Sequence, residues 1–310
     1  MDKWAFIFPG QGSQYVGMGK DFYDSFKECK DVIDLANEAC DKDLLHILFD
    51  ENEDINKTRY TQLAMLSVEA AILAKTKADG IVPDMCAGLS LGEYAALICA
   101  DAISLKDAFE LVALRGRLME EAYPTGGAMS AVMNTGATAI EEACKTASEL
   151  GEVNIANYNC PGQIVITGKE EAVAKAVEIL LANGTKKCIS LKVSGPFHSA
   201  LMREAGTRLY EAMKNVDIKD PAIAYVSNVE STVVEKRDNI KELLRRQISE
   251  SVMWQQSIEL MIDRGITTFV EIGPKKSLSK FMKKINKEVK VINIENISGY
   301  EEVVKLWSQR

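Results

Sequence analysis

Five residues, Gly88-Leu89-Ser90-Leu91-Gly92, constrain the fold of this chain more than any other stretch. They form a G-x-S-x-G pattern, in which a serine occupies a tight and strained turn between a strand and a helix. A glycine is needed on each side of that turn because the chain passes close to itself there. An apolar run over 81–87 precedes the pattern, and an alanine-rich segment over 94–100 follows it. The sequence therefore predicts a strand, a sharp turn and a helix, with Ser90 as a candidate nucleophile and a purely structural turn as the alternative.

The N-terminal third of the chain alternates short apolar runs with helical patterns. We expect strands over 6–8 and 81–87, and helices over 23–40 and 62–77. Such alternation is typical of a parallel sheet covered by helices, so the fold class is predicted to be α/β.

A different order of elements begins at Gly127. The pattern reads strand, helix, strand, strand, helix, strand, over 127–134, 138–150, 153–159, 162–168, 170–182 and 186–194. This β-α-β-β-α-β order is the signature of a ferredoxin-like unit. We therefore expect a ferredoxin-like subdomain over 126–193, inserted into an α/β-hydrolase-like large domain with a parallel sheet, formed by 1–125 and 194–310.

Composition excludes several classes of function. A net charge of −8 over 310 residues disfavours nucleic acid or an anionic membrane as the main partner. No apolar run is long enough to span a bilayer, and we expect neither export nor a membrane anchor. Seven cysteines without a C-x-x-C pair favour a reducing cytoplasm over a disulfide framework, and indicate no zinc site.

The stretch FPGQGSQ near the N-terminus is glycine-rich and follows a predicted strand. Such loops often hold an anion with backbone N–H groups. The dinucleotide fingerprint fails because Tyr15 stands where its third glycine should be, and the phosphate-loop pattern fails because Asp21 follows Gly19-Lys20. The loop is therefore either an ordinary tight turn or a site for an anion other than a nucleotide phosphate.

A serine nucleophile needs a base, and the chain has two histidines. His46 lies in an apolar stretch, where a packed or capping role is expected, whereas His198 lies in a predicted loop after Gly195-Pro196. Arg115 shares the apolar face of a predicted helix with Leu111 and Leu118. An arginine on a buried face needs an anion, which is either a protein carboxylate or a bound substrate.

Several motifs together resemble the malonyl-CoA:acyl carrier protein transacylase family, which is similar to the acyltransferase domains of fatty acid and polyketide synthases. They are FPGQGSQ, GLSLGEYAA, ALRGRLM, NYNCPGQIVITG, GPFH and FVEIGP, and they follow the family's order from about residue 6 to about residue 278. The resemblance implies a ping-pong transfer that depends on three residues. Ser90 would attack the thioester of malonyl-CoA, His198 would take its proton, and Arg115 would bind the malonyl carboxylate.

The resemblance also assigns the glycine-rich loop. The backbone N–H groups of Gln11 and Leu91 would stabilise the tetrahedral oxyanion, Gln62 would line the site, and Asn159 would lie in the cleft. No cofactor is implied, since malonyl-CoA is the substrate and phosphopantetheine is carried by the partner, acyl carrier protein. A monomer and a role in fatty acid synthesis are expected.

Three positions depart from the family's pattern. Leu89 replaces the usual histidine before the nucleophile, and the proline often seen after Gln62 is absent. Met253 stands where a polar residue is common before a tryptophan. The resemblance implies that the main-chain carbonyl of Met253 orients His198, so that no triad aspartate is needed.

Two other functions remain open from the sequence. One is a serine thioesterase or esterase with a Ser-Asp-His triad. The other is a non-catalytic scaffold that binds carrier protein. Because carrier proteins are acidic, we expect a basic rim near the cleft, with Lys186, Lys187, Lys275 and Lys276 as candidates.

Overall fold

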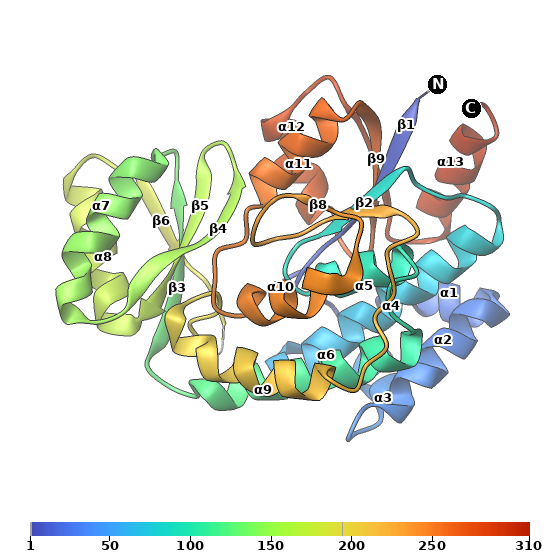
Figure 1. Ribbon diagram of the computed structural model, residues 1–310, viewed down its shortest axis with the longest axis horizontal. Helices are drawn as coiled ribbons and strands as arrows, with labels where there is room; N and C mark the ends of the chain where they lie inside the picture. Colours follow the sequence, from blue (N-terminus) through green and yellow to red (C-terminus); the bar gives the residue numbers. More distant parts are fainter. Residues whose placement is uncertain (1, 194) are drawn as a thin grey trace.

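Two β-sheets organise the chain, and the computed structural model describes residues 2–193 and 195–310. In Figure 1 the smaller sheet and its two helices form a lobe on the left, and the larger sheet lies within the helices on the right. The described chain therefore has a mixed α/β fold with two separate sheets, as its alternating patterns predict.

The larger sheet has six strands in the order β10-β9-β1-β2-β7-β8. All neighbouring pairs are parallel except β7 and β8, which are antiparallel at one edge. The strands are β1 (Lys3–Phe8), β2 (Met85–Gly88), β7 (Ala224–Val226), β8 (Val233–Val234), β9 (Ile266–Ile272) and β10 (Lys290–Ile294). The predicted parallel sheet is thus confirmed.

Helices cover both faces of this sheet because its central strand is buried on both sides. Along β1, Phe6 and Phe8 contribute to one hydrophobic cluster, and Ala5 and Ile7 to another. This is the alternation expected of a strand. The first cluster includes side chains of α1 (Lys20–Ser25), α2 (Lys27–Glu38), α3 (Leu44–Phe49), α4 (Thr58–Ala78), α5 (Gly92–Cys99), α6 (Leu105–Ala122), α9 (Arg203–Met213), α10 (Ile240–Gln247) and α13 (Ile297–Trp307). The second includes side chains of α11 (Trp254–Asp263) and α12 (Ser277–Ile285).

The smaller sheet is antiparallel, with the strand order β4-β5-β3-β6. Its elements follow the predicted β-α-β-β-α-β order: β3 (Gly127–Met133), α7 (Ala137–Ala147), β4 (Val153–Cys160), β5 (Gln163–Lys169), α8 (Glu170–Ala182) and β6 (Lys187–Ser190). Both helices pack on one face of the sheet, where their apolar side chains form a third hydrophobic cluster. The final strand is shorter than the predicted 186–194, and the end of that prediction, residue 194, lies outside the described residues.

Three other element predictions need correction. The single helix expected over 23–40 is two helices, because Phe26 is extended and packs its ring near those of Phe22 and Tyr300. The strand expected over 81–87 begins only at Met85, since Pro83 has no N–H with which to join the sheet. Helix α4 begins one turn earlier than the predicted 62–77.

The two sheets meet through the segment that leads into α11. Val252 donates its backbone N–H to Ala156 of β4 at 2.8 Å and accepts from Tyr158 at 2.9 Å. The side chain of Asn154, also on β4, donates to the carbonyl of His198 at 3.0 Å. The smaller sheet therefore contacts the loop that carries a candidate base.

Among the described helices, none is both long and apolar enough to cross a membrane. All seven cysteines are free thiols, and five of them are buried.

Candidate active site

Ser90 lies at a strained turn between β2 and α5, as its motif predicts. Its φ is 54°, in the left-handed region that residues with a Cβ rarely adopt. A Cβ added to Gly88 would lie 1.9 Å from the backbone of Gly92, and one added to Gly92 would lie 2.2 Å from the carbonyl oxygen of Phe8. Both flanking glycines are therefore required by close backbone approach.

His198 lies beside Ser90 although the two are 108 residues apart in sequence. The Nε2 atom of His198 is 2.9 Å from the Oγ atom of Ser90. Its Nδ1 atom is 2.7 Å from the main-chain carbonyl oxygen of Gln247. A carbonyl only accepts, so in the neutral ring Nδ1 carries the proton and Nε2 presents a lone pair to the serine hydroxyl. This geometry allows Nε2 to take the proton of Ser90.

The expectation that Met253 orients His198 is wrong. The carbonyl of Met253 instead accepts hydrogen bonds from the backbone N–H and the hydroxyl of Ser257, in the first turn of α11. The carbonyl that contacts His198 belongs to Gln247, the last residue of α10. Carbonyl groups in the last turn of a helix have no N–H donor within that helix, so this one can accept a hydrogen bond from the imidazole.

Burial keeps the imidazole of His198 neutral. His198 is 4% exposed. Desolvation, together with the nearby guanidinium of Arg115, lowers the pKa of His198 from 6.5 to about 4. At neutral pH the ring is therefore an unprotonated base.

Arg115 points at the same serine from α6 and is fully buried. Its Nη2 atom is 3.2 Å from Ser90 Oγ and its Nη1 atom is 2.6 Å from Oε1 of Gln62. Nη2 also donates to Oε1 of Gln247 at 2.9 Å, whereas Nε has no hydrogen-bond partner within the described chain. No carboxylate of residues 2–193 or 195–310 forms an ion pair with this guanidinium, so it retains the capacity to bind an anion.

The glycine-rich loop faces Ser90 from the end of β1. A Cβ on Gly10 would lie 2.6 Å from the carbonyl oxygen of Leu89, so the loop and the turn are in close contact. The side chain of Gln11 donates to Thr58 at 3.0 Å. Leu91 precedes the first turn of α5, where backbone N–H groups have no acceptor within the helix.

One cavity of about 250 Å³ brings the predicted residues together. Its lining includes all six site residues predicted from the sequence, namely Gln11, Gln62, Ser90, Leu91, Arg115 and His198. Asn159 of β4 and Leu89 also line it, as do apolar residues of the smaller sheet such as Met129 and Val165. The cavity therefore lies where the two sheets meet, with the hydroxyl, the imidazole and the guanidinium at one place.

His46 lies elsewhere, and of the packed and capping roles expected for it the structure excludes the packed one. It is exposed on α3, and its Nδ1 atom is 3.0 Å from the carboxylate of Asp50 at the end of that helix. The core positions of this helix are taken by Leu44, Ile47 and Leu48.

Three buried polar residues beneath Ser90 were not found from the sequence. The side chain of Asn228 accepts from the backbone N–H of Ser90 and donates to the carbonyl of Gly88, both at 2.6 Å. Nε2 of Gln247 donates to the carbonyl of Ser90 and to Oε2 of Glu93, both at 2.7 Å. Of the three, only Glu93 could have been noticed in the sequence, as a carboxyl within an apolar helix. Asn228 and Gln247 lie more than 130 residues from Ser90, so no local pattern connects them with it.

A strained serine with a neutral imidazole at hydrogen-bond distance is the arrangement of enzymes that form an ester on serine. The buried guanidinium beside that serine adds a position for an acyl group with a negative charge. Fold and site thus define the class of serine acyltransferases and hydrolases.

Comparison with known proteins narrows the class. Residues 5–305 match the family model of the acyl transferase domain. The malonyl CoA-acyl carrier protein transacylase of Bacillus subtilis is 44% identical over 98% of this chain and 97% of its own. The crystal structure of malonyl CoA-acyl carrier protein transacylase from Clostridium perfringens superposes with a TM-score of 0.95 at 40% identity, covering 99% of this chain and 98% of the other.

A third similar structure contains a partner. It is a type II PKS acyl-carrier protein in complex with its malonyl-transacylase, and it has a TM-score of 0.95 at 34% identity over 98% of this chain and 99% of the other. The chain therefore belongs to the acyl transferase family and, within it, to the malonyl CoA-acyl carrier protein transacylases.

Proposed function

We propose that this protein transfers the malonyl group from malonyl-CoA to the phosphopantetheine thiol of acyl carrier protein, and so supplies extender units for fatty acid synthesis. One observation carries the proposal: the hydroxyl oxygen of Ser90 lies 2.9 Å from Nε2 of His198 and 3.2 Å from Nη2 of Arg115. A nucleophile, its base and a cation for the acyl carboxylate thus share one cavity.

In the first half-reaction, Ser90 Oγ attacks the thioester carbonyl while His198 Nε2 takes the hydroxyl proton. The backbone N–H groups of Gln11 and Leu91 stabilise the oxyanion of the tetrahedral intermediate. The carbon–sulfur bond then breaks, and His198 returns the proton to the CoA thiolate. The product is a malonyl ester on Ser90.

The second half-reaction runs through the same atoms. The phosphopantetheine thiol gives its proton to His198, and its sulfur attacks the malonyl ester. The bond between Ser90 Oγ and the acyl carbon breaks, and His198 returns the proton to that oxygen. The enzyme is restored and the malonyl group is carried as a thioester on the carrier protein.

Arg115 provides the selectivity in this proposal. Its guanidinium binds the malonyl carboxylate through charge-assisted hydrogen bonds. An acetyl group would leave the cation without an anion in a desolvated pocket, which disfavours acetyl-CoA. The hydrogen bond that Oε1 of Gln62 accepts from Nη1 of Arg115 supports a role for Gln62 in orienting the guanidinium, beyond lining the site.

The domain organisation that supports this function has two parts. We infer an α/β-hydrolase-like catalytic domain over 1–125 and 194–310, and an inserted ferredoxin-like subdomain over 126–193. The strand order β4-β5-β3-β6 and the placement of α7 and α8 support the second part, and the serine turn at the end of β2 supports the first.

A basic rim for the acidic carrier protein is part of the proposal. Lys276 directly precedes Ser277, which lines the cavity, and Lys187 begins β6, which leads to the cavity residue Leu191. Lys186 and Lys275 are their exposed neighbours. We infer that a monomer of this protein binds carrier protein at this rim, with the phosphopantetheine arm extended into the cavity.

The triad hydrolase is the weaker alternative because His198 contacts a main-chain carbonyl, and no carboxylate within the described chain is hydrogen-bonded to its ring. The decisive experiment treats the protein with malonyl-CoA and analyses it by mass spectrometry. We expect malonate on the peptide that contains Ser90, none in Ser90→Ala, and malonyl carrier protein once carrier protein is added. Release of free malonate alone would identify a hydrolase, and an unmodified wild-type protein would identify a scaffold.

A further inference from the structure

Glu93 is a buried carboxyl directly beneath Ser90. It lies in the first turn of α5 and is 1% exposed. Its Oε2 atom accepts from Nε2 of Gln247 at 2.7 Å, and its Oε1 atom accepts from the backbone N–H of Asn228 at 3.4 Å. Because Glu93 does not line the cavity, it has no direct access to a substrate.

The amide of Gln247 is held in one orientation. Its nitrogen donates to the carbonyl of Ser90 and to Glu93, both at 2.7 Å, and its oxygen accepts from Nη2 of Arg115 at 2.9 Å. A flipped amide would set its oxygen against those two acceptors and its NH₂ group against the guanidinium. The side chain of Gln247 therefore transmits the charge of Glu93 to Arg115 as a fixed dipole.

This arrangement orients Arg115 without neutralising it by direct contact. The guanidinium contacts the neutral oxygens of Gln62, Gln247 and Ser90. A carboxylate in place of either amide would form an ion pair with the guanidinium and compete with an acyl carboxylate. Burial raises the pKa of Glu93 to about 7, although the hydrogen bonds from Gln247 and Asn228 and the charge of Arg115 act in the opposite direction, so the carboxylate that accepts both hydrogen bonds is the main form above that pH.

We propose that Glu93 is a positioning residue that fixes the amide of Gln247, so that Arg115 faces the cavity oriented by neutral oxygens and free to bind an acyl carboxylate. Glu93 thereby sets the preference for malonyl over acetyl groups without touching either one. This inference rests on the proposed function, because it concerns the selectivity of that same site.

The test is Glu93→Gln, which preserves size but leaves one acceptor for two donors. Either Gln247 or the backbone N–H of Asn228 then faces an NH₂ group, and a flip of the Gln247 amide relieves the first conflict at the expense of Arg115. We expect kcat/KM for malonyl-CoA to fall at least about tenfold, mainly through KM, and that for acetyl-CoA to change less than about twofold. The ratio of the two is independent of how much of the variant is folded.

Two further variants make the result specific. Glu69→Gln is the matched control, since Glu69 is another fully buried carboxyl, has no hydrogen-bond partner among the described residues and lies outside this network. It should leave the ratio unchanged. The exchange Glu93→Gln with Gln247→Glu restores a donor–acceptor match between positions 93 and 247 but places a carboxylate against Arg115 and against the carbonyl of Ser90, so the ratio should remain low.

Each result decides the matter. A proportional loss with both acyl-CoAs, an unchanged ratio in Glu93→Gln, or a ratio restored by the exchange would overturn the role of Glu93 alone. A wild-type protein that shows no preference for malonyl-CoA would instead refute the proposed function, and this inference with it.

Discussion

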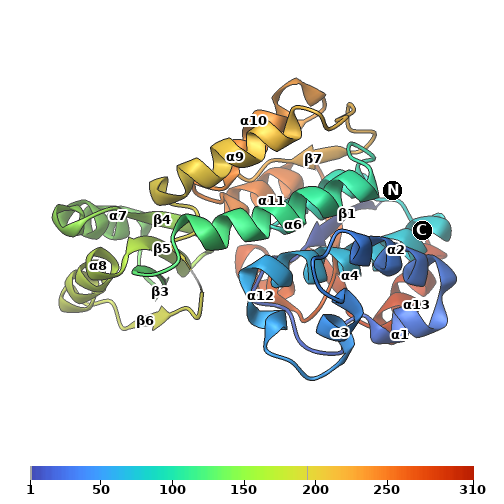
Figure 2. The ribbon, with the colours of Figure 1, turned by 90° about the horizontal axis from the view of Figure 1, so that it is seen from below.

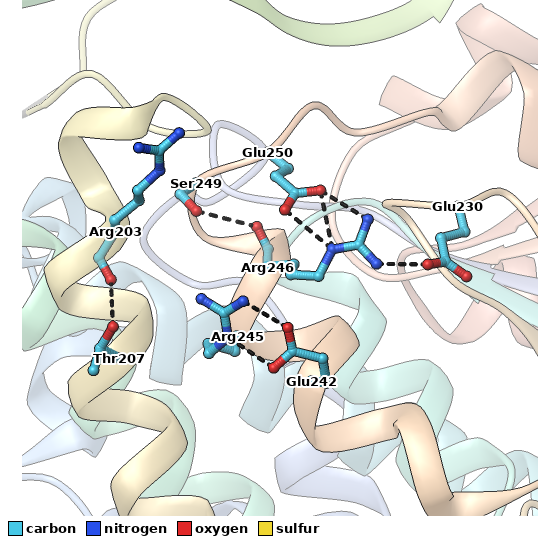
Figure 3. A network of polar contacts seen from close by, with 8 residues as sticks. All are labelled: Arg203, Thr207, Glu230, Glu242, Arg245, Arg246, Ser249 and Glu250. Atoms are coloured by element: carbon cyan, nitrogen blue, oxygen red, sulfur yellow. Dashed lines mark hydrogen bonds and ion pairs between the residues drawn. The ribbon is translucent and has the colours of Figure 1, made fainter.

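Arginines occupy two contrasting environments in this molecule. On α10, Arg246 is hydrogen-bonded to Glu250 and Glu230, and Arg245 to Glu242, all near the surface (Figure 3). In the cavity, Arg115 is fully buried, lies 5.7 Å from the ring centre of Tyr94, and within the described chain is hydrogen-bonded only to neutral oxygens. Gln247, which accepts a hydrogen bond from Arg115, directly follows Arg246 at the end of α10, so the two environments adjoin.

The difference separates arginines that are satisfied by the protein from one that is not. Surface pairs such as Arg246–Glu250 gain little, because water and salt screen both charges. A buried cation without a carboxylate is costly to the fold, and the cost is offset when a ligand supplies the anion. The contrast therefore supports a substrate role for Arg115 on physical grounds, apart from any family resemblance.

Of the changes that test this contrast, removal of Arg115 should have the largest effect on activity. In Arg115→Ala the malonyl carboxylate loses its partner and two amide oxygens lose a donor, so kcat/KM for malonyl-CoA should fall about a hundredfold or more. Transfer of acetyl or longer acyl groups should persist or increase. Steady-state kinetics with an acyl-CoA panel measures both.

The matched control is Arg246→Ala on α10. Its kcat/KM for malonyl-CoA should remain within about twofold of wild type, since its carboxylate partners are solvated. Equal losses in the two variants would remove the distinction between the environments.

The pH dependence tests the comparison further, because no carboxylate of the described residues raises the pKa of His198. With a pKa of about 4, the imidazole is neutral at pH 5 and above and becomes protonated below pH 4. With acetyl-CoA, the value of kcat/KM should therefore be flat above about pH 5 and fall about tenfold per pH unit below pH 4. Malonyl-CoA should show the same inflection and a further loss below about pH 7, where Glu93 takes up a proton.

The same titration affects folding with a defined sign. Between pH 6.5 and 4 the unfolded chain binds a proton at His198 that the folded chain does not. The free energy of unfolding should therefore decrease as the pH falls through this interval. An inflection near pH 6.5 with acetyl-CoA would show that the ring of His198 is more exposed to solvent or closer to a carboxylate than the structure places it.

Sequence patterns predicted the parts of this site that depend on local geometry. The serine turn requires glycine at 88 and 92, and the apolar face of α6 requires Arg115 to be buried, so both could be read from neighbouring residues. The order of elements in the smaller sheet followed from periodicity alone. The location of His198 in a loop was also correct, but its contact with Ser90 required the family's pattern.

The remaining parts depend on packing between distant segments. Every residue carries a main-chain carbonyl, so nothing in the sequence distinguishes Gln247 from Met253 as the partner of His198. The hydrogen bond from the backbone N–H of Ser90 to the side chain of Asn228 joins segments 138 residues apart. The break at Phe26 likewise reflects its contact with Tyr300, near the other end of the chain.

Lysines show the same contrast between paired and unpaired charges, and a smaller effect on activity is expected from changing them. On α1 and α2, Lys20, Lys27 and Lys30 each pair with an aspartate four residues later. Near the cavity, Lys187 and Lys276 are exposed and form no ion pair within residues 2–193 and 195–310. Figure 2 shows α2 and the smaller sheet on opposite sides of the large sheet's helices. Unpaired charge is thus available at the proposed docking rim.

Charge reversal at this rim should weaken carrier-protein docking. In Lys187→Glu with Lys276→Glu, KM for carrier protein should rise about three- to tenfold at low salt, and less at high salt, while KM for malonyl-CoA should be unchanged. Lys27→Glu on α2 is the control and should alter neither. Equal changes in both KM values would indicate damage to the cavity and defeat the docking proposal.

The smallest effect is expected for the ion pairs of α10 themselves. A double-mutant cycle of Arg246→Ala and Glu250→Ala, followed by denaturant unfolding, should give a coupling energy of at most about 1 kcal/mol. The side chains are 29% and 43% exposed, so solvent competes with the pair. Coupling well above 2 kcal/mol would mean that this network supports the end of α10, and with it the carbonyl of Gln247 that holds His198. In that case the surface arginines would belong to the machinery of the cavity, and the two environments would be one.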